Sequence, residues 1–368
     1  MFKKSIIAVS SLLFGLTTLM FTPALAAEEK VVNVYNWFEY LPAPVIERFE
    51  KETGIKVVLD TFESMDVVET KLLTGKSGYD LVMSGGEQAQ RLVSNGLFAK
   101  LDKSKLTNYG NLDPGVLASL AKKDKGNTHG VPYMWGTTGI AFNEALVRKY
   151  LPDANVRSLD LIFKPENMKK LAEAGVAFNN EPFEVIPIVL NYLGLPPYST
   201  RKEDLNKAKE LLESVRPYIR HFNTGQFVQQ LATGELAVAL TYNGEAGFAS
   251  MRADELKNGI YIDYSIPDEG TLMWFDFFGI PADAPHKDNA HKFLNFLMRP
   301  KEIAEASNTL YYPNGVAASL PYILDEIKGD PDIYPPKAVL DNMFTDQLLT
   351  TKERKKYTRL WTNYKANR

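Results

Sequence analysis

The sequence of 368 residues contains no cysteine and only four histidines. The absence of cysteine excludes disulfide bonds, thiolate zinc sites, iron–sulfur clusters and cysteine nucleophiles. No pair of histidines has an HxxxH or HExxH spacing; they are His129, His221, His286 and His291. The 42 basic and 45 acidic residues give a net charge of -3, and no stretch is as basic as a nucleic-acid-binding segment. We therefore expect no metal, no cofactor and no nucleic-acid partner.

Sequence motifs of the common enzyme classes are also missing. No GxGxxG or GxxxxGK[ST] follows an expected strand, and Ser84-Gly85-Gly86 does not fit the GxSxG pattern of a nucleophile elbow. Paired carboxylates are uninformative in a chain with 45 acidic residues. The sequence therefore indicates a protein that is not an enzyme.

Long apolar stretches are absent after the first 26 residues. At the start of the chain, Lys3 and Lys4 precede an apolar segment at 6–21, and Ala24-Leu25-Ala26 has the pattern of a cleavage site. A membrane anchor is the alternative, but Ser, Gly and Thr dilute a segment that is already short for a membrane span. We expect a signal peptide at 1–26, cleaved near Ala26. The mature chain would then lie outside the cytoplasm with a net charge of -5, because two lysines are removed from a chain of charge -3.

Strand-like and helix-like segments alternate from residue 31 onward. The expected elements are a strand at 31–35, a helix that begins near Pro44 and ends at Gly54, a strand at 55–59, a helix capped by Asp66, and a strand at 79–83. This βαβαβ order predicts a mostly parallel sheet flanked by helices. Ligands bind beyond the carboxyl ends of the strands in such sheets.

A second α/β unit follows the first. Helix-like segments occur at 165–174, 183–193, 205–215, 225–233 and 289–298, and strand-like segments at 236–240 and 271–280. About 340 mature residues exceed the usual size of a single core, which favours two α/β lobes.

Aromatic residues stand beside carboxylates at several expected strand ends. The three segments are Trp37-Phe38-Glu39-Tyr40, Tyr242-Asn243-Gly244-Glu245 and Trp274-Phe275-Asp276. Ring faces attract an ammonium group and carboxylates pair with its charge, so these segments would suit an organic cation. The alternative is that the rings only pack in the core and the acids only face solvent. Asp276 interrupts an apolar segment, where a carboxylate needs a partner, either a ligand cation or an internal arginine.

Seven ordered blocks of sequence carry a resemblance to a known family. They are Val34-Tyr35-Asn36-Trp37, residues 49–58, Gly78-Tyr79-Asp80-Leu81-Val82, residues 101–106, residues 132–140, residues 189–194 and Ile333-Tyr334-Pro335-Pro336. With these blocks the mature chain resembles the polyamine-binding periplasmic proteins of ABC transporters, most of all the putrescine-binding type. The resemblance implies an α/β, two-lobe type II solute-binding protein whose ligand lies in the cleft between lobes. It implies lobes at 27–132 plus 255–323 and at 133–254 plus 324–368.

The same resemblance implies a ligand-binding set that combines aromatic rings, carboxylates and hydroxyl groups. Its members are Trp37, Phe38, Glu39, Ser84, Glu184, Thr224, Tyr242, Glu245, Trp274, Asp276 and Tyr312. In the family pattern, acids at the positions of Glu245 and Asp276 pair with the two amines, and an acid at the position of Glu184 acts through water.

Several positions depart from that pattern. Phe38 stands in place of a serine, Tyr242 in place of a tryptophan, and Glu39 and Glu245 are each one methylene longer than the usual aspartate. Residues 87–90 replace a more apolar loop. Every carboxylate position keeps its charge, so a cation is still expected, but the preferred length of the ligand cannot be inherited.

The leading hypothesis is therefore a monomeric periplasmic protein that binds putrescine, spermidine or a related cation and presents it to the permease of an ABC importer. A different class remains open, in which the protein senses a polyamine and regulates a membrane signalling enzyme of the cyclic-di-GMP type; neighbouring genes would separate the two. A more distant alternative is a ferric-iron carrier that uses Tyr311 and Tyr312 as ligands, although adjacent tyrosines more often pack in a core.

Overall fold

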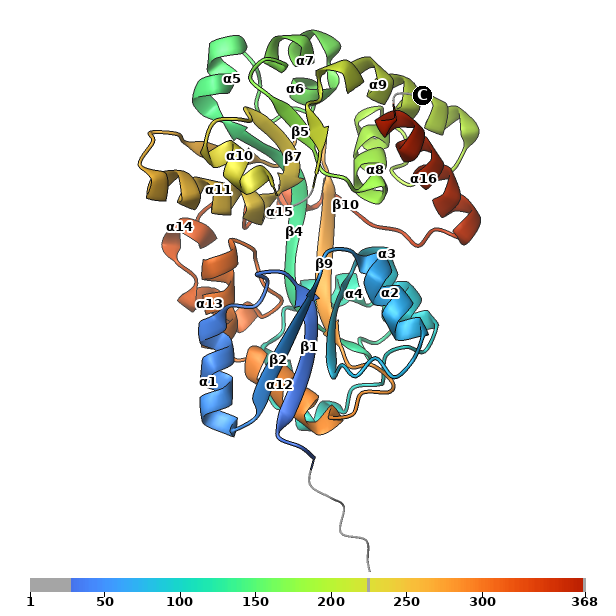
Figure 1. The fold of residues 1–368 in the computed structure, drawn as a ribbon, viewed down its shortest axis with the longest axis vertical. Helices are drawn as coiled ribbons and strands as arrows, with labels where there is room; N and C mark the ends of the chain where they lie inside the picture. The colour runs from blue at the N-terminus through green and yellow to red at the C-terminus, as the bar shows by residue number, and fades with distance from the viewer. Residues whose placement is uncertain (1–27, 224–225, 367–368) are drawn as a thin grey trace, which may run out of the picture.

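The computed structural model describes residues 28–223 and 226–366. The expected signal peptide at 1–26 lies outside these residues, and so does Thr224. The described chain forms two lobes that are joined by two long strands, β4 (Gly130–Asn143) and β9 (Leu272–Gly279), as Figure 1 shows. No helix within the described ranges is long and apolar enough to cross a membrane.

Helices and strands alternate along most of the chain. The remaining strands are β1 (Val31–Trp37), β2 (Lys56–Phe62), β3 (Leu81–Gly85), β5 (Val176–Phe178), β6 (His221–Phe222), β7 (Val238–Tyr242), β8 (Ile262–Ser265) and β10 (Phe344–Thr345). The α-helices are α1 (Ala43–Thr53), α2 (Met65–Leu73), α3 (Gly86–Ser94), α4 (Pro114–Leu120), α5 (Glu144–Tyr150), α6 (Asp160–Phe163), α7 (Pro165–Leu171), α8 (Pro182–Tyr192), α9 (Lys202–Val215), α10 (Phe227–Ala232), α11 (Asn243–Leu256), α12 (Lys287–Leu297), α13 (Pro300–Leu310), α14 (Asp325–Lys328), α15 (Lys337–Leu340) and α16 (Thr351–Lys365). Short 3₁₀ helices lie at Lys103–Lys105, Tyr109–Asn111, Arg216–Tyr218 and Ala317–Tyr322.

The strands are hydrogen-bonded in the order β2-β1-β3-β9-β4-β7-β5-β6, with β10 beside β9 and β8 beside β4. The outer strands run parallel, whereas β9 and β4 run antiparallel to their neighbours along this path. The first part of β4 pairs with β9, and its last part pairs with β7 and β8. A single continuous strand therefore passes from one lobe into the other, which is the geometry of a hinge between domains.

The βαβαβ order expected at the start of the mature chain is confirmed by β1, α1, β2, α2 and β3. Helix α1 carries Pro44 in its first turn and ends at Gly54, whose φ of 68° is readily adopted by glycine. The expectation that Asp66 caps the next helix is wrong. Helix α2 begins at Met65 after Ser64, so Asp66 lies inside the first turn.

Strand β4 was not predicted. Its side chains are buried almost without interruption, so it lacks the alternation of apolar and polar residues that reveals a half-exposed strand. Glycine, proline and threonine at Pro132, Gly136, Thr137 and Gly139 also obscure the pattern.

Each lobe has its own apolar core. One core includes Val34, Phe49 and Phe293, and the other includes Phe178 and Trp361. The boundaries of the lobes stay a prediction. The pairing of β8 with the last part of β4 favours placing residues 262–265 in the second lobe instead of the first.

Candidate functional site

Four aromatic side chains, from elements far apart in the sequence, pack edge to face. Trp274 on β9 contacts Tyr242 at the end of β7 and Tyr312 after α13, with ring centroids 5.7 and 5.1 Å apart. Tyr40 extends the group, with its ring centroid 5.9 Å from that of Tyr312. We call Tyr40, Tyr242, Trp274 and Tyr312 the aromatic cluster. Three of its members belong to the predicted ligand-binding set, whereas Tyr40 belongs to one of the three predicted aromatic segments but was not assigned to that set.

The carboxylate of Asp276 lies next to this aromatic cluster. The Tyr40 hydroxyl donates a hydrogen bond to Asp276 Oδ2 at 3.1 Å, and the Tyr133 hydroxyl holds the carbonyl of Tyr40 at 2.9 Å. Burial raises the pKa of Asp276 to about 7, although the Tyr40 hydrogen bond and the Lys123 ammonium oppose the shift. In the described part of the chain no arginine pairs with Asp276. Of the two partners that the sequence left open, the internal arginine is thus not found.

A glycine allows Asp276 to lie where it does. Asp276 is opposite Gly85 in the antiparallel pairing of β9 with β3. A Cβ atom on Gly85 would collide with Asp276 Oδ1. The backbone at Gly85 is extended, so this glycine is needed for the close approach of the carboxylate and not for an unusual turn.

Glu184 in the first turn of α8 is a second acid of this region and, like Asp276, is partly buried. Its Oε2 accepts hydrogen bonds from Thr138 Oγ1 at 2.9 Å and Asn179 Nδ2 at 3.2 Å, and its Oε1 accepts one from the Tyr242 hydroxyl at 3.2 Å. Burial raises the pKa of Glu184 to about 7 in spite of these three donors. The Tyr242 hydroxyl thus connects Glu184 to the aromatic cluster.

Glu181 is a further acid that the sequence reasoning missed. It immediately precedes α8, three residues before Glu184. Burial, together with the nearby carboxylates of Glu184 and Asp66, raises the pKa of Glu181 to about 8. The spacing of two acids by three residues at the start of a helix is the signal that could have revealed it, because such residues share a face.

Glu245 and Ser84 are also brought near this region. Glu245 lies in the first turn of α11 and accepts a hydrogen bond from the Thr241 hydroxyl. Burial raises the pKa of the Tyr312 hydroxyl, and the Glu245 carboxylate is the largest of the charges that add to the shift. Ser84 is fully buried on β3, next to Gly85.

The remaining predicted residues are not packed into the aromatic cluster. Trp37 at the end of β1 packs on Phe62, with centroids 4.4 Å apart. The side chain of Phe38 is 69% exposed, and Glu39 is exposed with a left-handed φ of 54°. Thr224 lies outside the described residues, so its position is not given. The roles assigned to all of these residues stay predictions.

Several buried polar atoms on or just after β1, β3, β5, β9 and β10 lack hydrogen bonds within the described chain. They are Asn36 Nδ2, Ser84 Oγ, Asn179 Oδ1, Trp274 Nε1 and Asp346 Oδ2. Buried polar groups in folded proteins nearly always have a partner. Unpaired donors and acceptors beside aromatic rings and buried acids are what a site for a polar ligand requires.

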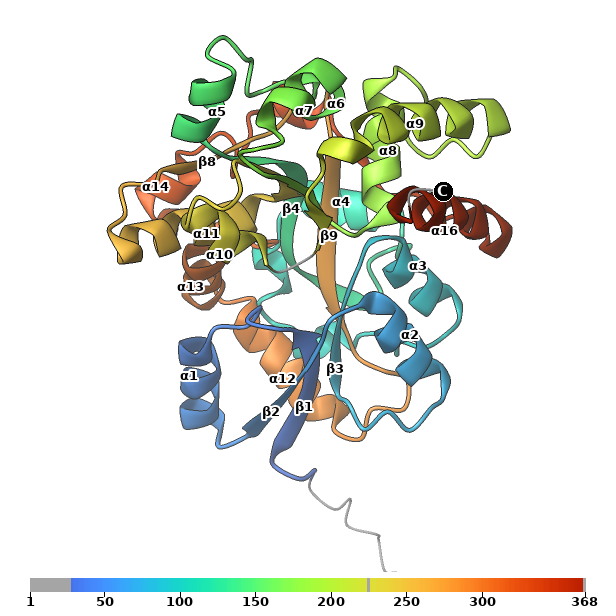
Figure 2. The same ribbon diagram turned by 45° about the horizontal axis from the view of Figure 1, so that its top comes forward.

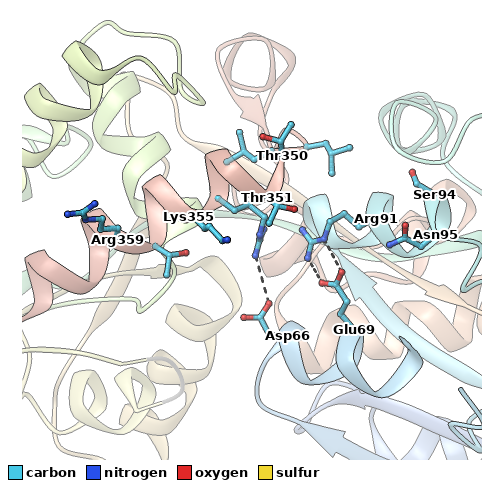
Figure 3. Close-up of a pocket in the computed structure, with 13 residues that line it drawn as sticks. Asp66, Glu69, Arg91, Ser94, Asn95, Thr350, Thr351, Lys355 and Arg359 are labelled. Atoms are coloured by element: carbon cyan, nitrogen blue, oxygen red, sulfur yellow. Dashed lines mark hydrogen bonds and ion pairs between the residues drawn. The ribbon is translucent and has the colours of Figure 1, made fainter. Parts of the chain in front are cut away.

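A cavity of about 850 Å³ lies elsewhere, between α16 of one lobe and α2 and α3 of the other (Figure 3). Figures 1 and 2 both show α16 beside these two helices. Two ion pairs line the cavity: Glu69 pairs with Arg91, and Asp66 pairs with Arg354. None of the predicted ligand-binding residues within the described ranges lines this cavity. We therefore place the candidate site at the aromatic cluster, where buried polar atoms lack hydrogen bonds, and not at this cavity.

Residues 87–90, which replace a more apolar loop of the family pattern, lie in the first turns of α3 and contact two other parts of the chain. Glu87 is buried, pairs with Arg91 and Arg354, and accepts a hydrogen bond from the backbone of Leu349 at 3.1 Å. Gln88 donates to Asp66 at 2.9 Å. These side chains of α3 thus contact both α2, through Gln88, and the C-terminal segment, through Glu87.

Comparison with known proteins identifies the class of protein that this fold and site belong to. Residues 45–335 match the family described as bacterial extracellular solute-binding protein, and the chain belongs to this family. The chain is 43% identical over 362 residues to the putrescine-binding periplasmic protein PotF of Escherichia coli, with 98% of each chain covered. It is 42% identical over 346 residues to the putrescine-binding periplasmic protein SpuD of Pseudomonas aeruginosa, with 94% of each chain covered.

A solved structure shows the same similarity of fold. The chain is similar to the spermidine/putrescine ABC transporter substrate-binding protein PotD of Streptococcus pneumoniae, with a TM-score of 0.78 and 25% identity over 91% of this chain and 98% of that one. These comparisons confirm the family resemblance and the two-lobe α/β fold that the sequence implied.

Proposed function

We propose that this protein binds a linear polyamine in the periplasm, after cleavage of a signal peptide near Ala26, and delivers it to the permease of an ABC importer. The observation that carries the proposal is the pair of partly buried acids, Asp276 and Glu184, on either side of edge-to-face aromatic rings. The names of the relatives, which are putrescine-binding and spermidine-binding proteins, support the same class of ligand.

The chemistry of these groups favours a cation over a neutral or anionic ligand. Burial raises the pKa of Asp276 and Glu184 to about 7, and no cation of the described chain forms an ion pair with either acid, so both are partly protonated near neutral pH. An ammonium would restore their ionised form and would be attracted by the ring faces of Trp274 and Tyr242. Glu181 and Glu184 lie together at the α8 end, so that end has enough negative charge for more than one ammonium. No covalent chemistry is needed, and the proposed role is binding alone.

A panel of ligands tests this function directly. The mature protein is unfolded, stripped of ligand and refolded, and its thermal unfolding is followed with diamines of increasing length, triamines, amino acids and ferric iron. A ligand present at about 100 times its dissociation constant should add about 2.7 kcal/mol to the free energy of unfolding. No stabilisation by any amine would overturn the proposal, and stabilisation by ferric iron alone would favour the tyrosine-based iron carrier.

The close approach of Asp276 to Gly85 makes a second, geometric prediction. In the Gly85→Ala variant the new methyl group displaces the carboxylate of Asp276, so the affinity for a diamine should fall by about tenfold or more. Gly110→Ala is the matched control, because a Cβ atom on Gly110 meets no described atom within 4 Å. Calorimetry on both variants checks the result. Equal affinity in the two variants would mean that the position of Asp276 does not matter for binding.

A further inference from the structure

A buried ion pair lies beside the candidate site and was not among its predicted residues. Lys123 follows α4, and its ammonium pairs with Oδ1 of Asp346, which follows β10. The two side chains are only 6% and 8% exposed. Removing two charges from water is costly, so a buried pair of this kind is weak evidence for stability alone. The position of the Lys123–Asp346 pair beside the candidate site suggests a role in ligand binding.

Two consecutive glycines place Asp346 next to Asp276. Gly85 abuts Asp276 Oδ1, and a Cβ atom on Gly86 would lie 3.5 Å from Asp346 Oδ2. The strand pairing agrees, because β10 runs beside β9 and Thr345 is opposite Met273. Asp346 and Trp274 each directly follow one residue of this last pair. Asp276 and Asp346 thus both lie near the start of α3, close enough for the Asp346 charge to affect the pKa of Asp276.

The two oxygens of Asp346 have different surroundings. Oδ1 is taken by the Lys123 ammonium, whereas Oδ2 is buried and makes no hydrogen bond in the part of the chain that the structure describes. The charges of Lys123 and Asp346 also affect the acids of the candidate site. Lys123 lowers the pKa of Asp276, whereas Asp346 raises the pKa of both Asp276 and Glu184. The pair therefore belongs electrostatically to the candidate site.

We propose that Lys123 is a specificity-determining residue of the site, an internal ammonium that Asp346 holds beside Asp276 where a further ammonium of a longer ligand would otherwise bind. The inference rests on the proposed binding of polyamines and deepens it. With Lys123 in place, the Asp276 end accepts one terminal ammonium and repels an extension. Without Lys123, Asp346 becomes a free carboxylate that attracts an additional amine.

The test is a charge cycle measured by calorimetry with 1,4-diaminobutane, spermidine and spermine. Lys123→Met should raise the affinity for spermine relative to the diamine by about tenfold or more, because Asp346 is left unpaired. Asp346→Asn should lower the diamine affinity by about tenfold or more, because the Lys123 ammonium then faces Asp276 alone. The double variant, which removes both charges, should recover the diamine affinity to within about threefold of the unmodified protein.

Two controls separate this proposal from a purely structural role. Lys122→Met removes the charge of the exposed neighbouring lysine and should leave all three affinities unchanged. Thermal unfolding of each ligand-free variant reports whether it folds. If Lys123→Met does not fold, comparing the diamine affinities of Asp346→Asn and the double variant still tests whether the Lys123 charge affects binding. Equal changes for all three ligands in Lys123→Met, or a double variant that binds no better than Asp346→Asn, would overturn the proposal. An unmodified protein that binds none of the polyamines would instead overturn the proposed function.

Discussion

Asp276→Asn is expected to weaken the binding of a diamine by roughly 2 to 4 kcal/mol, which is about 30- to 1000-fold. In the described chain, Asp276 has the hydrogen bond from Tyr40 but no ion-pair partner, so its charge is available to a ligand ammonium. An asparagine has nearly the same shape and still accepts the Tyr40 hydrogen bond, but it offers no charge. The bound ammonium would then be buried without its partner. Calorimetry at pH 7 and above measures the loss.

The stability of the ligand-free variant distinguishes this effect from misfolding. Because burial already raises the pKa of Asp276 to about 7, removing its charge should not destabilise the ligand-free protein at neutral pH. Asp153→Asn is the matched control, since Asp153 is exposed and far along the chain from the candidate site residues. A loss of affinity below about 0.5 kcal/mol in Asp276→Asn, well under the usual cost for a buried charge pair, would refute the assignment.

The affinity for a polyamine is expected to rise steeply between about pH 5.5 and 8. Burial raises the pKa of Asp276 and Glu184 to about 7 and that of Glu181 to about 8 in the ligand-free protein. A cation binds the ionised acids, so each acid that must lose a proton lowers the affinity by up to about tenfold per pH unit below its pKa. Calorimetry at pH 6 in buffers of different ionisation enthalpy should detect protons released on binding. Glu184→Gln should release fewer of them.

The stability of the ligand-free protein should change in the opposite direction. A carboxyl whose pKa is higher in the folded state binds more protons when folded, so these three acids lower the free energy of unfolding as the pH rises from about 4 to 8. The stabilisation by a saturating diamine should therefore increase over the same range. Thermal unfolding with and without ligand at several pH values checks both trends. A ligand-induced shift that does not depend on pH would contradict the proposed ionisation of these acids.

The order of helices and strands at the start of the mature chain could be predicted from local sequence signals. Apolar segments, Pro44 and Gly54 predicted the order β1, α1, β2, α2 and β3, which the structure confirms, although Asp66 does not cap α2. The strand β4 was not readable, because it is buried on both faces and its two halves pair with different lobes. The periodicity of apolar residues along a strand does not show which distant strands pair with it.

The candidate site also has some residues that the sequence could predict and others that it could not. Asp276 could be singled out because a carboxylate in an apolar strand needs a partner. Tyr40, the partner found for it, stands in one of the predicted aromatic segments, but nothing local connects it to a carboxylate 236 residues away. Lys123 and Asp346 were missed because a charged residue beside a turn or helix end is usually exposed.

What the sequence by itself determined is the alternation of elements, the family and the residue types that suit a cation. Only the tertiary structure decided which acids are removed from water and which charges face one another. The physical reason is that the pKa of a carboxyl and the worth of an ion pair depend on burial and on neighbours within a few ångströms. In this protein those neighbours, Tyr40 with Asp276 and Lys123 with Asp346, come from opposite ends of the chain.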